Sequence, residues 1–451
     1  MKLRSYSEYK PSGIEWLGEI PKHWEVIRVK ALEGNKASVV QTGPFGAQLH
    51  ADDYVDDGVP LILIRNVGDM RIDTTDIPMV SHEDAERLSM YRLEAGDIVF
   101  SRVGSIGKIA LCTEREQGWL ISGQMLRLKI TNPLLHSYFA AYAFGCSSIL
   151  TFVELQSVGS TRESINTDIL RNMPLPIPPT DEQHAIAAFL DRETARIDML
   201  IEKKQRQIEL LQEKRSALIS HAVTKGLDPN TKMKDSRVEW IGNIPAHWEV
   251  KRLKFLVSEP LKYGANEAAE LDDPELPRYI RITDVDENGR LRDETFKSIP
   301  EDVARPYLLK EGDLLLARSG ATVGKSFYYE PSWGRAAYAG YLIRARFNPT
   351  KTMPRFINYF TNSQHYWQWL RASFIQATIQ NVSAEKYANL IVPVPPFEEQ
   401  KRIVSYLDSM WQRLNNMTDK VRQSIQVLKE YRSALISATV TGKIDIREDI
   451  R

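Results

Sequence analysis

Apolar residues at helical spacing mark two long segments of this chain as helices. The second segment begins near Glu399 and keeps strict 3-4 spacing, the pattern of a coiled-coil seam. Its apolar positions are Ile403, Leu407, Met410, Leu414, Met417, Val421, Leu428, Tyr431 and Leu435. The first segment carries a looser stripe, interrupted by Lys204, formed by Ile186, Leu190, Ile197, Leu200, Ile201, Ile208, Leu211 and Leu218. Each helix is expected to run for about 40 residues, or roughly 60 Å.

A seam of this kind needs a second apolar surface to cover it. We expect the two helices to cover each other and to run antiparallel. The alternative is that each helix folds back onto its own neighbouring globular block. Neither segment contains an internal helix breaker, which favours two continuous helices.

The segments before each helix have a different pattern. Short β-type runs, such as residues 60–64 and 313–316, alternate with Gly and Asp punctuation, which predicts mixed α/β or α+β blocks. A proline-rich stretch, residues 174–179 and 393–396, separates each block from its helix. Because proline fixes φ and cannot sit inside a helix, we interpret these stretches as hinges.

The chain is written twice. Residues 12–32 read SGIEWLGEIPKHWEVIRVKAL, and residues 236–256 read SRVEWIGNIPAHWEVKRLKFL. Further matches follow in the same order: 93–108 with 309–325, 122–130 with 339–347, 176–183 with 393–400, and 215–224 with 432–441. The sequence therefore predicts an α/β (α+β) fold with two globular domains, two long α-helices packed as an antiparallel coiled coil, and an internal pseudo-two-fold repeat.

Composition narrows the possible functions. The 451 residues include 59 basic and 59 acidic residues, so the formal charge is zero and any nucleic-acid contact must be patchy. Two cysteines and eight scattered histidines supply neither a disulfide framework nor zinc-ligand spacing. No apolar window is long enough for a membrane span, and the N-terminus lacks the apolar core of a signal peptide. A cytoplasmic location fits best.

One repeated segment offers chemistry for DNA. Gly96, Asp97 and Arg102 lead to Lys108 through a glycine-containing loop, and the second copy runs from Gly312 to Lys325 through Arg318. Arg and Lys beside such a loop suit phosphate oxygens, so Arg102, Lys108, Arg318 and Lys325 are predicted DNA contacts. The alternative is a tight turn whose arginine pairs with a local carboxylate. We expect Arg318→Ala to weaken DNA binding and to reduce its salt dependence.

A polar loop precedes each proline-rich stretch, within residues 156–166 and 376–383. Gln and Asn can bond adenine, Arg can bond guanine, and Ser or Thr can bond either a base or a phosphate. The candidate residues are Gln156, Ser160, Thr161, Arg162, Gln376, Thr378, Gln380 and Asn381. The alternative, which can hold at the same time, is that Asn166 and Ser383 cap following helices.

The sequence does not match the motifs of a nucleotide hydrolase, an adenine methyltransferase or a metal-dependent nuclease. Between Gly320 and Gly324 stand three residues, whereas a phosphate-binding P-loop needs four. Val394 stands where an adenine methyltransferase would place an Asn or Asp that accepts a hydrogen bond from the target amine. We find no convincing carboxylate set for a metal-dependent nuclease. The repeated Trp and His positions, including His23 and Trp24, look structural, although exposed tryptophans also anchor partner proteins.

The tandem order of EWxGxIPxHW, GDxxxxRxGxxxGK, PxPPxxEQ and a long helix ending in RSALIS resembles the specificity subunit of type I restriction-modification enzymes over nearly the whole chain. The resemblance implies four parts: target-recognition domain 1 at 1–178, a central helical spacer at 179–228, target-recognition domain 2 at 229–396, and a C-terminal helical spacer at 397–451. It also implies a subunit without catalytic residues, metal or cofactor of its own.

The partners implied by the resemblance are double-stranded DNA, two modification subunits that use S-adenosylmethionine to methylate adenine, and restriction subunits that use ATP and Mg²⁺. The leading hypothesis is recognition of an asymmetric bipartite DNA site, one half-site per domain. The alternative is an autonomous DNA methyltransferase or nuclease with unrecognised motifs, and a third interpretation is a coiled-coil scaffold that binds only proteins.

Overall fold

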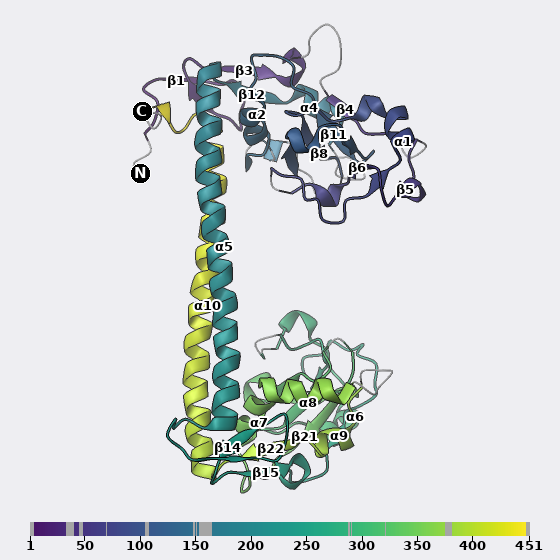
Figure 1. Ribbon diagram of the computed structural model, residues 1–451, viewed down its shortest axis with the longest axis vertical. Helices are drawn as coiled ribbons and strands as arrows, with labels where there is room; N and C mark the ends of the chain where they lie inside the picture. Colours follow the sequence, from purple (N-terminus) through teal and green to yellow (C-terminus); the bar gives the residue numbers. More distant parts are fainter. Residues whose placement is uncertain are drawn as a thin grey trace. The chain divides into compact units, whose positions relative to one another are not determined.

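The computed structural model describes residues 4–32, 40–44, 48–68, 70–103, 108–147, 149, 151–152, 165–286, 289, 291–320, 322–374 and 381–447. The chain divides into two compact units. Unit 1 comprises Met1–Lys204 and Gln423–Arg451, and unit 2 comprises Gln205–Arg422. The long helices α5 (Thr180–Lys225) and α10 (Phe397–Val440) each contribute one segment to both units (Figure 1).

The other elements of unit 1 are short strands and helices. In chain order they are β1 (Tyr9–Pro11), β2 (Glu19–Pro21), β3 (Glu25–Arg28), β4 (Val40–Thr42), β5 (Tyr54–Val55), β6 (Val59–Ile62), β7 (Met79–Val80), α1 (His82–Arg87), β8 (Ile98–Ser101), β9 (Ile109–Leu111), β10 (Leu120–Ile121), β11 (Met125–Leu128), α2 (Ser137–Phe144), α4 (Thr167–Asn172) and β12 (Pro174–Ile177). The antiparallel sheet β4-β11-β8-β9 contributes Phe100 and Leu126 to the core of unit 1. A second sheet has the order β10-β6-β7-β5, with β10 and β6 parallel.

Unit 2 repeats this plan. Its other elements are β13 (Met233–Asp235), β14 (Asn243–Pro245), β15 (Glu249–Arg252), β16 (Lys262–Tyr263), β17 (Arg278–Ile280), α6 (Glu301–Ala304), β18 (Leu314–Ala317), β19 (Ser326–Tyr328), β20 (Ala336–Tyr338), β21 (Leu342–Ala345), α7 (Pro354–Thr361), α8 (Gln364–Phe374), α9 (Ala384–Ala388) and β22 (Ile391–Val394). The sheet β16-β21-β18-β19 has the same order and the same antiparallel pairing as β4-β11-β8-β9. Strands β17 and β20 pair in parallel, as β6 and β10 do.

In unit 1 the beginning of α5 packs against the end of α10. Ile186 and Leu190 share a core with Leu435 and Val440. Further along α5, Asp198 forms an ion pair of 3.0 Å with Arg432 of α10. The residue numbers of the two helices change in opposite directions, so this pair is antiparallel.

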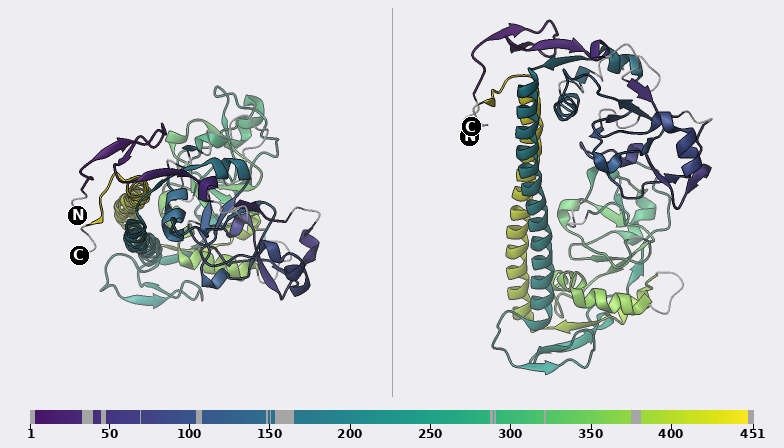
Figure 2. Two further views of the ribbon diagram at one scale, coloured as in Figure 1. Left: turned by 90° about the horizontal axis from the view of Figure 1, so that it is seen from above. Right: turned by 45° about the horizontal axis from the view of Figure 1, so that its top comes forward.

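In unit 2 the end of α5 packs against the beginning of α10. Val223 shares a core with Ile403, and the Arg215 guanidinium lies 4.5 Å from the centre of the Trp411 ring. This pair is also antiparallel, and the two segments lie side by side in Figures 1 and 2. The predicted fold class is confirmed: mixed α and β domains, two long helices paired antiparallel, and an internal repeat.

The seam is narrower than the apolar pattern predicted. Buried positions include Ile186, Leu190, Ile197, Ile208, Leu211, Ile403, Leu407, Leu414, Val421 and Leu435, and Leu218 and Leu428 are partly buried. Met417 and Tyr431, which we placed in the seam, are instead 41% and 50% exposed, and Leu200 is also exposed. A 3-4 pattern fits several neighbouring stripes of one helix, and only the position of the partner helix decides which stripe is covered.

The proline-rich stretches begin as strands and are not free hinges: residues 174–177 of the first and 393–394 of the second lie in a strand. Residues Pro174–Ile177 form β12, which pairs antiparallel with β3, and Ile391–Val394 form β22, which pairs with β15. Proline tolerates an edge strand because the missing N–H can face away from the partner. Each stretch therefore ties its long helix to the globular part of the same unit through a ladder of backbone hydrogen bonds.

Two repeated motifs meet at the start of each long helix. In unit 1 the His23 ring lies 2.8 Å from a carboxylate oxygen of Glu182, and the Trp24 Nε1–H donates to the other oxygen at 3.2 Å. In unit 2 the same contact joins His247 and Glu399 at 2.7 Å. Both tryptophans, Trp24 and Trp248, are fully buried. The structural interpretation of the repeated Trp and His positions is confirmed.

The glutamine that follows each of these glutamates, Gln183 in α5 and Gln400 in α10, holds the start of its helix through further hydrogen bonds. The Gln183 side chain accepts from the His136 backbone N–H at 2.8 Å and donates to the carbonyl of Pro178 at 2.9 Å. The Gln400 side chain accepts from the Met353 backbone N–H at 2.8 Å. Gln183 and Gln400 are fully buried. The repeated Glu-Gln pair thus joins the helix start to two separate segments of its globular part.

The C-terminal segment packs on the N-terminal segment of unit 1. Asp445 forms a backbone bridge with Arg4, and Gly442 lies against Pro21 and Trp24. In unit 2 Gly226, which follows α5, lies against Pro245 and Trp248 in the same way. Both glycines have positive φ angles. The end of α10 in unit 1 therefore occupies the position that the end of α5 occupies in unit 2.

Candidate nucleic-acid interface

The repeated Gly-Asp pair builds a turn that starts one of the two central strands of each four-stranded sheet, β18 in unit 2 and β8 in unit 1. Gly312 has a φ of +84°, and the Lys310 backbone N–H donates to Asp313 Oδ2 at 2.8 Å. In unit 1 Gly96 has a φ of +91°, and the Glu94 N–H donates to the equivalent Asp97 oxygen at 2.9 Å. These residues are structural and set the course of β18 and β8.

The charge of this buried aspartate is balanced differently in the two units. Asp313 accepts two hydrogen bonds from the Arg346 guanidinium, at 2.8 and 2.6 Å. In unit 1 the nearest corresponding contact joins Arg127 and Asp97 at 3.9 Å. Burial raises the pKa of Asp97 to about 6, mainly through loss of solvation.

Arg318 follows β18 and is held between two neighbouring segments. Its backbone N–H donates to the carbonyl of Tyr341 at 3.0 Å, and its carbonyl accepts from Val382 at 2.8 Å. Its guanidinium lies 4.7 Å from the centre of the Tyr263 ring, and its Nε–H points to Asn381 Oδ1 at 3.4 Å. The structure thus brings Arg318 and Asn381, both predicted site residues, into one group.

Arg102 occupies the same backbone position in unit 1. Its N–H donates to the carbonyl of Gln124 at 2.9 Å, and its carbonyl accepts from Ile165 at 2.9 Å. The cross-strand register places Thr42 opposite Leu126 and Tyr263 opposite Ile343, so Thr42 stands where unit 2 has Tyr263. The backbone frame is shared, but the side chains beside the arginine differ.

The two predicted lysines lie across the loop from these arginines. The carbonyl of Lys325 accepts from Ala317, and the carbonyl of Lys108 accepts from Ser101, so each lysine closes the loop that its arginine opens. Both lysines are exposed. Lys325 lines a cavity of about 330 Å³ with Tyr328 of β19 and with residues of α7 and α8, whereas Arg318 contacts β16 on the other side of β18.

In unit 2 the turn alternative is therefore correct for the loop but not for the arginine, and in unit 1 Gly104 and Gly107 of the equivalent loop lie outside the described residues. Gly320 and Gly324 have positive φ angles, as a tight turn requires. Among the residues that the structure describes, however, no carboxylate forms an ion pair with Arg318.

The polar loops are described only at their ends. Gln156, Ser160, Thr161, Arg162, Gln376, Thr378 and Gln380 lie outside the described residues. The capping alternative is confirmed for both loops: Asn166 Oδ1 accepts from the Ile169 N–H at 2.8 Å, and Ser383 Oγ accepts from the Lys386 N–H at 3.2 Å.

Two tyrosines near Arg318 were missed by the sequence analysis. Tyr263 is 41% exposed and Tyr341 is 61% exposed. A signal for Tyr341 was present, because the match of 122–130 with 339–347 places it opposite Gln124 within an otherwise similar segment. Tyr263 lies on edge strand β16, and its approach to Arg318 depends on the order of the sheet.

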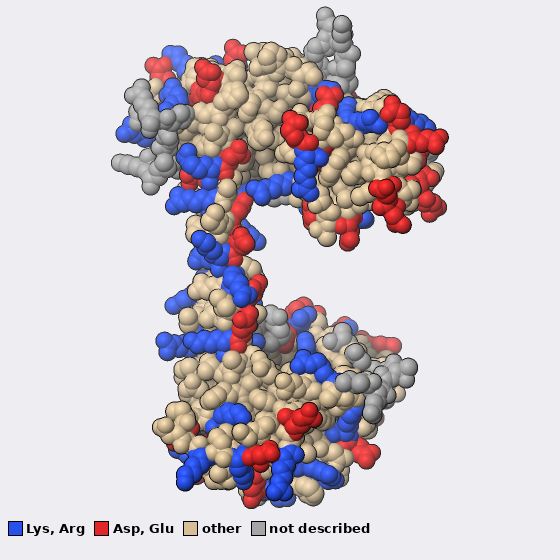
Figure 3. Space-filling model, in the orientation of Figure 1, with Lys and Arg blue, Asp and Glu red and all other residues tan. Residues whose placement is uncertain are grey.

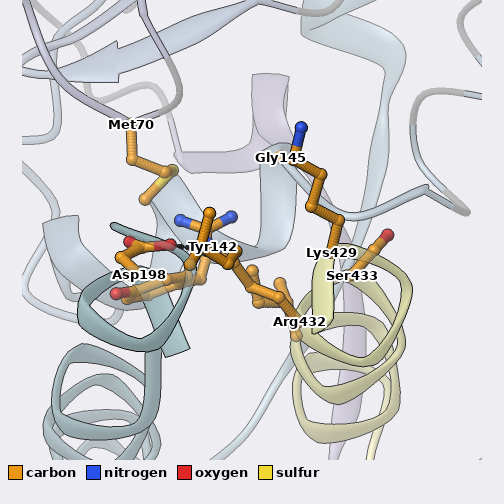
Figure 4. A pocket seen from close by; sticks show the side chains of 9 residues that line it. Met70, Tyr142, Gly145, Asp198, Lys429, Arg432 and Ser433 are labelled. Carbon is orange, nitrogen blue, oxygen red and sulfur yellow. Dashed lines mark ion pairs between the residues drawn. The ribbon is translucent and has the colours of Figure 1, made fainter. Parts of the chain in front are cut away.

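A separate cavity of about 440 Å³ lies in unit 1 beside the helix pair (Figure 4). Tyr142 of α2, Asp198 of α5 and Arg432 of α10 line it. The Tyr142 hydroxyl donates to Asp191 at 2.7 Å, and the ion pair of Asp198 with Arg432 links the two helices. These polar groups serve to join α2, α5 and α10.

The surface carries both signs of charge. Figure 3 shows Lys and Arg side chains interspersed with Asp and Glu on the face in view, as zero formal charge leads one to expect. Within the described part of the chain, no group of His, Cys, Asp and Glu has the arrangement of a metal site. No helix among the described residues is long and apolar enough to cross a membrane.

Comparisons with known proteins agree on one family. Residues 63–210 and 245–427, most of the chain, match the family described as type I restriction modification DNA specificity domain. The type I restriction enzyme MjaVIII specificity subunit of Methanocaldococcus jannaschii is 23% identical, over 95% of this chain and 94% of that protein.

Two solved structures share the fold. A chain from the work on complex assembly and conformational transition of the type I R-M system has a TM-score of 0.68 and 15% identity, with 94% of this chain and 99% of that chain covered. The HsdS subunit from Thermoanaerobacter tengcongensis has a TM-score of 0.51 and 16% identity, with 94% and 98% covered. The duplicated family match over most of the length, together with the duplicated fold, shows that this chain belongs to the type I restriction modification DNA specificity domain family and is a DNA-specificity subunit, not a catalytic subunit, of a type I restriction-modification system.

Proposed function

We propose that the chain recognises an asymmetric bipartite DNA site, with one half-site read by each unit. The observation that carries this proposal is a shared backbone frame with different side chains. Arg318 stands beside Tyr263 and Tyr341 in unit 2, whereas Arg102 stands beside Thr42 and Gln124 in unit 1. The same backbone arrangement with different side chains favours recognition of two half-sites that differ in sequence.

The DNA contacts in this proposal are the sequence candidates. Arg318 and Asn381 belong to one exposed edge of unit 2, and Arg102 takes the equivalent place in unit 1. Lys108 and Lys325 are exposed amines at the same loops and suit phosphates. The polar loop residues Gln156, Ser160, Thr161, Arg162, Gln376, Thr378 and Gln380 remain proposed contacts on their chemistry alone.

In this proposal residues 1–178 and 229–396 form the recognition domains, and 179–228 and 397–451 form the spacer that holds them. Continuous helices over Thr180–Lys225 and Phe397–Val440 support a spacer role, because a helix keeps a fixed rise per residue.

The spacer is also the proposed docking surface for the modification subunits. Apolar side chains outside the seam are exposed on both helices: Met199, Leu200 and Leu210 on α5, and Met417, Val427 and Tyr431 on α10. Exposed apolar groups on a long helix suit a helical partner. Restriction subunits would join the same assembly, S-adenosylmethionine, ATP and Mg²⁺ would be bound by the partners, and the complex would work in the cytoplasm.

The test is to map methylated adenines in cells that express this chain with its modification subunit. We expect two short, unequal sequences separated by a gap of fixed length. A single uninterrupted sequence, or a palindrome, would contradict the proposal. The autonomous enzyme is tested with the purified chain, S-adenosylmethionine, ATP, Mg²⁺ and plasmid DNA, where we expect neither methylation nor cleavage.

A further inference from the structure

Arg318 differs from the other arginines around its sheet in how its charge is balanced. Arg344 pairs with Glu259 at 2.8 Å, Arg346 with Asp313 at 2.6 Å, and Arg355 with Asp408 at 2.7 Å. Over the described part of unit 2, Arg318 has an aromatic ring and an amide as side-chain partners instead. Neutral partners leave its full positive charge available to an anion or an electron-rich acceptor.

The ring that supports Arg318 is itself fixed. Tyr263 lies on β16, which pairs with β21, and its hydroxyl accepts from the Ala384 backbone N–H at 3.0 Å. Ala384 begins α9, whose N-terminus is capped by Ser383. The guanidinium is therefore held over a surface that is anchored to both the sheet and a helix.

Among the residues that the structure describes, the remaining side-chain contact of Arg318 uses only Nε of the guanidinium. Asn381 engages Nε at 3.4 Å, and Asn381 is joined to the neighbouring Ser319 by a backbone bridge. Among the described residues, none accepts a hydrogen bond from the two terminal nitrogens of Arg318. These nitrogens form a planar fork with two parallel N–H donors.

A planar fork suits two acceptors side by side, and DNA offers them in two places: O6 and N7 of guanine in the major groove, and two oxygens of a phosphate. A phosphate can be met by a flexible cation from many directions. A base edge demands one plane, and Tyr263 together with Asn381 restricts the guanidinium to one orientation. The exposed side chain of Tyr341 beside it adds a further group able to contact a base.

We propose that Arg318 reads a guanine in the half-site bound by unit 2, and that Tyr263 and Asn381 are its positioning residues. This inference rests on the proposed function and names a base for it. It also replaces the expectation that Arg318 contacts a phosphate. Arg102 lacks the supporting ring, since Thr42 stands in its place, so the same reading is not extended to unit 1.

The first experiment compares methylation maps for the wild type, Arg318→Ala and Arg318→Lys, each expressed with the modification subunit. A guanine reader predicts that both variants lose discrimination at one G·C position of one half-site, by roughly 5- to 150-fold. Lysine keeps the charge but not the fork, so it does not restore the sequence. The other half-site stays unchanged.

Two results overturn the inference. If Arg318→Ala methylates the wild-type sequence at uniformly lower levels and Arg318→Lys restores them, Arg318 contacts a phosphate. If the methylation map of Arg318→Ala is unchanged, Arg318 serves only the structure of the turn. If the wild type itself shows no bipartite sequence, the proposed function fails first, and that failure is distinct from an unchanged Arg318→Ala map.

The second experiment does not depend on a variant. The wild-type complex is bound to duplexes in which each guanine of the half-site is replaced in turn by 7-deazaguanine, which lacks the N7 acceptor. We expect one replacement to weaken binding by roughly 3- to 10-fold. Equal binding to every such duplex contradicts the inference even if Arg318→Ala does not assemble.

Tyr263 provides the matched control for positioning. Tyr263→Phe loses the hydroxyl contact with Ala384 but keeps the ring on β16 beside Arg318, so it should keep the wild-type sequence, whereas Tyr263→Ala should relax the same G·C position as Arg318→Ala. A Tyr263→Ala map with reduced methylation but full discrimination would show that the ring is only structural.

Discussion

Units 1 and 2 share the same backbone arrangement but differ in the side chains at the proposed DNA-binding edge. In both, a histidine contacts a glutamate at the start of the long helix, next to a buried tryptophan, and in both, a glycine-aspartate turn opens a central strand of the sheet. The side chains that flank the following arginine are different. The repeated residues named above build the fold, and the residues that differ beside Arg102 and Arg318 lie at the proposed DNA edge.

The buried polar groups of this shared frame also differ between the two units in their hydrogen bonds and ion pairs. Asp313 is neutralised by a two-point contact with Arg346, whereas Asp97 has a more distant arginine, at 3.9 Å, and a raised pKa. Trp24 donates to Glu182, whereas the Trp248 N–H has no partner among the described residues. A repeat can thus keep its geometry while the energy of each contact changes, and this difference can be measured.

The largest expected difference concerns the buried aspartates. Asp313→Asn leaves the guanidinium of Arg346 with weaker neutralisation and should lower the free energy of unfolding by about 3 kcal/mol. Asp97→Asn should be neutral to stabilising at pH 7, because it removes a buried charge that is poorly paired. Urea unfolding of the intact chain checks this. Equal losses for the two variants would mean that the two turns are energetically the same.

The tryptophans should show the next difference. Trp24→Phe and Trp248→Phe remove the same volume from a fully buried site. Trp24→Phe also removes a hydrogen bond to a carboxylate, whereas Trp248→Phe removes an unsatisfied N–H, so the first should cost about 2 to 3 kcal/mol more. Thermal unfolding measures both. A greater loss for Trp248→Phe would reverse the assignment.

The pH dependence of stability should distinguish unit 1. Because the pKa of Asp97 is raised by burial from about 4 to about 6, the folded state binds its proton more tightly than the unfolded state. This contribution is present below pH 4 and is lost as the pH rises toward 6. Relative to Asp97→Asn, the wild type should lose about 2 kcal/mol between pH 4 and pH 7. Parallel pH profiles would exclude a raised pKa.

The smallest difference is expected at the glycines that follow the long helices. Gly226→Ala and Gly442→Ala both place a Cβ at a positive φ. At Gly442 the new Cβ would also overlap the Pro21 ring, whereas at Gly226 it would meet ordinary or slightly tight neighbours. Gly442→Ala should therefore cost about 1 kcal/mol more. Equal unfolding midpoints would mean that the Pro21 ring shifts freely.

The helices and the duplication could be predicted from the sequence because both depend on local pattern. Periodicity marks an amphipathic helix wherever it lies, and a repeat is visible without any structure. Proline stretches were misjudged because proline excludes helix but not edge strand. Met417 and Tyr431 were misplaced because the covered stripe depends on the partner helix.

The candidate site was predicted only in part. Arg318 and Asn381 were found from their residue types, and the structure brings them together. Tyr263 was not found, because its place beside Arg318 requires the strand order β16-β21-β18, which no local pattern gives. The role of Glu182 was also hidden, since its contact with His23 joins positions 159 residues apart.

The most direct test of the account exchanges one recognition domain. Residues 1–178 are replaced by the equivalent segment of a family member with a different DNA site, and methylated adenines are mapped with the modification subunit present. The account predicts that one half of the methylated sequence changes while the other half stays as in the wild type. A change in both halves, or in neither, would contradict the claim that each unit reads its own half-site.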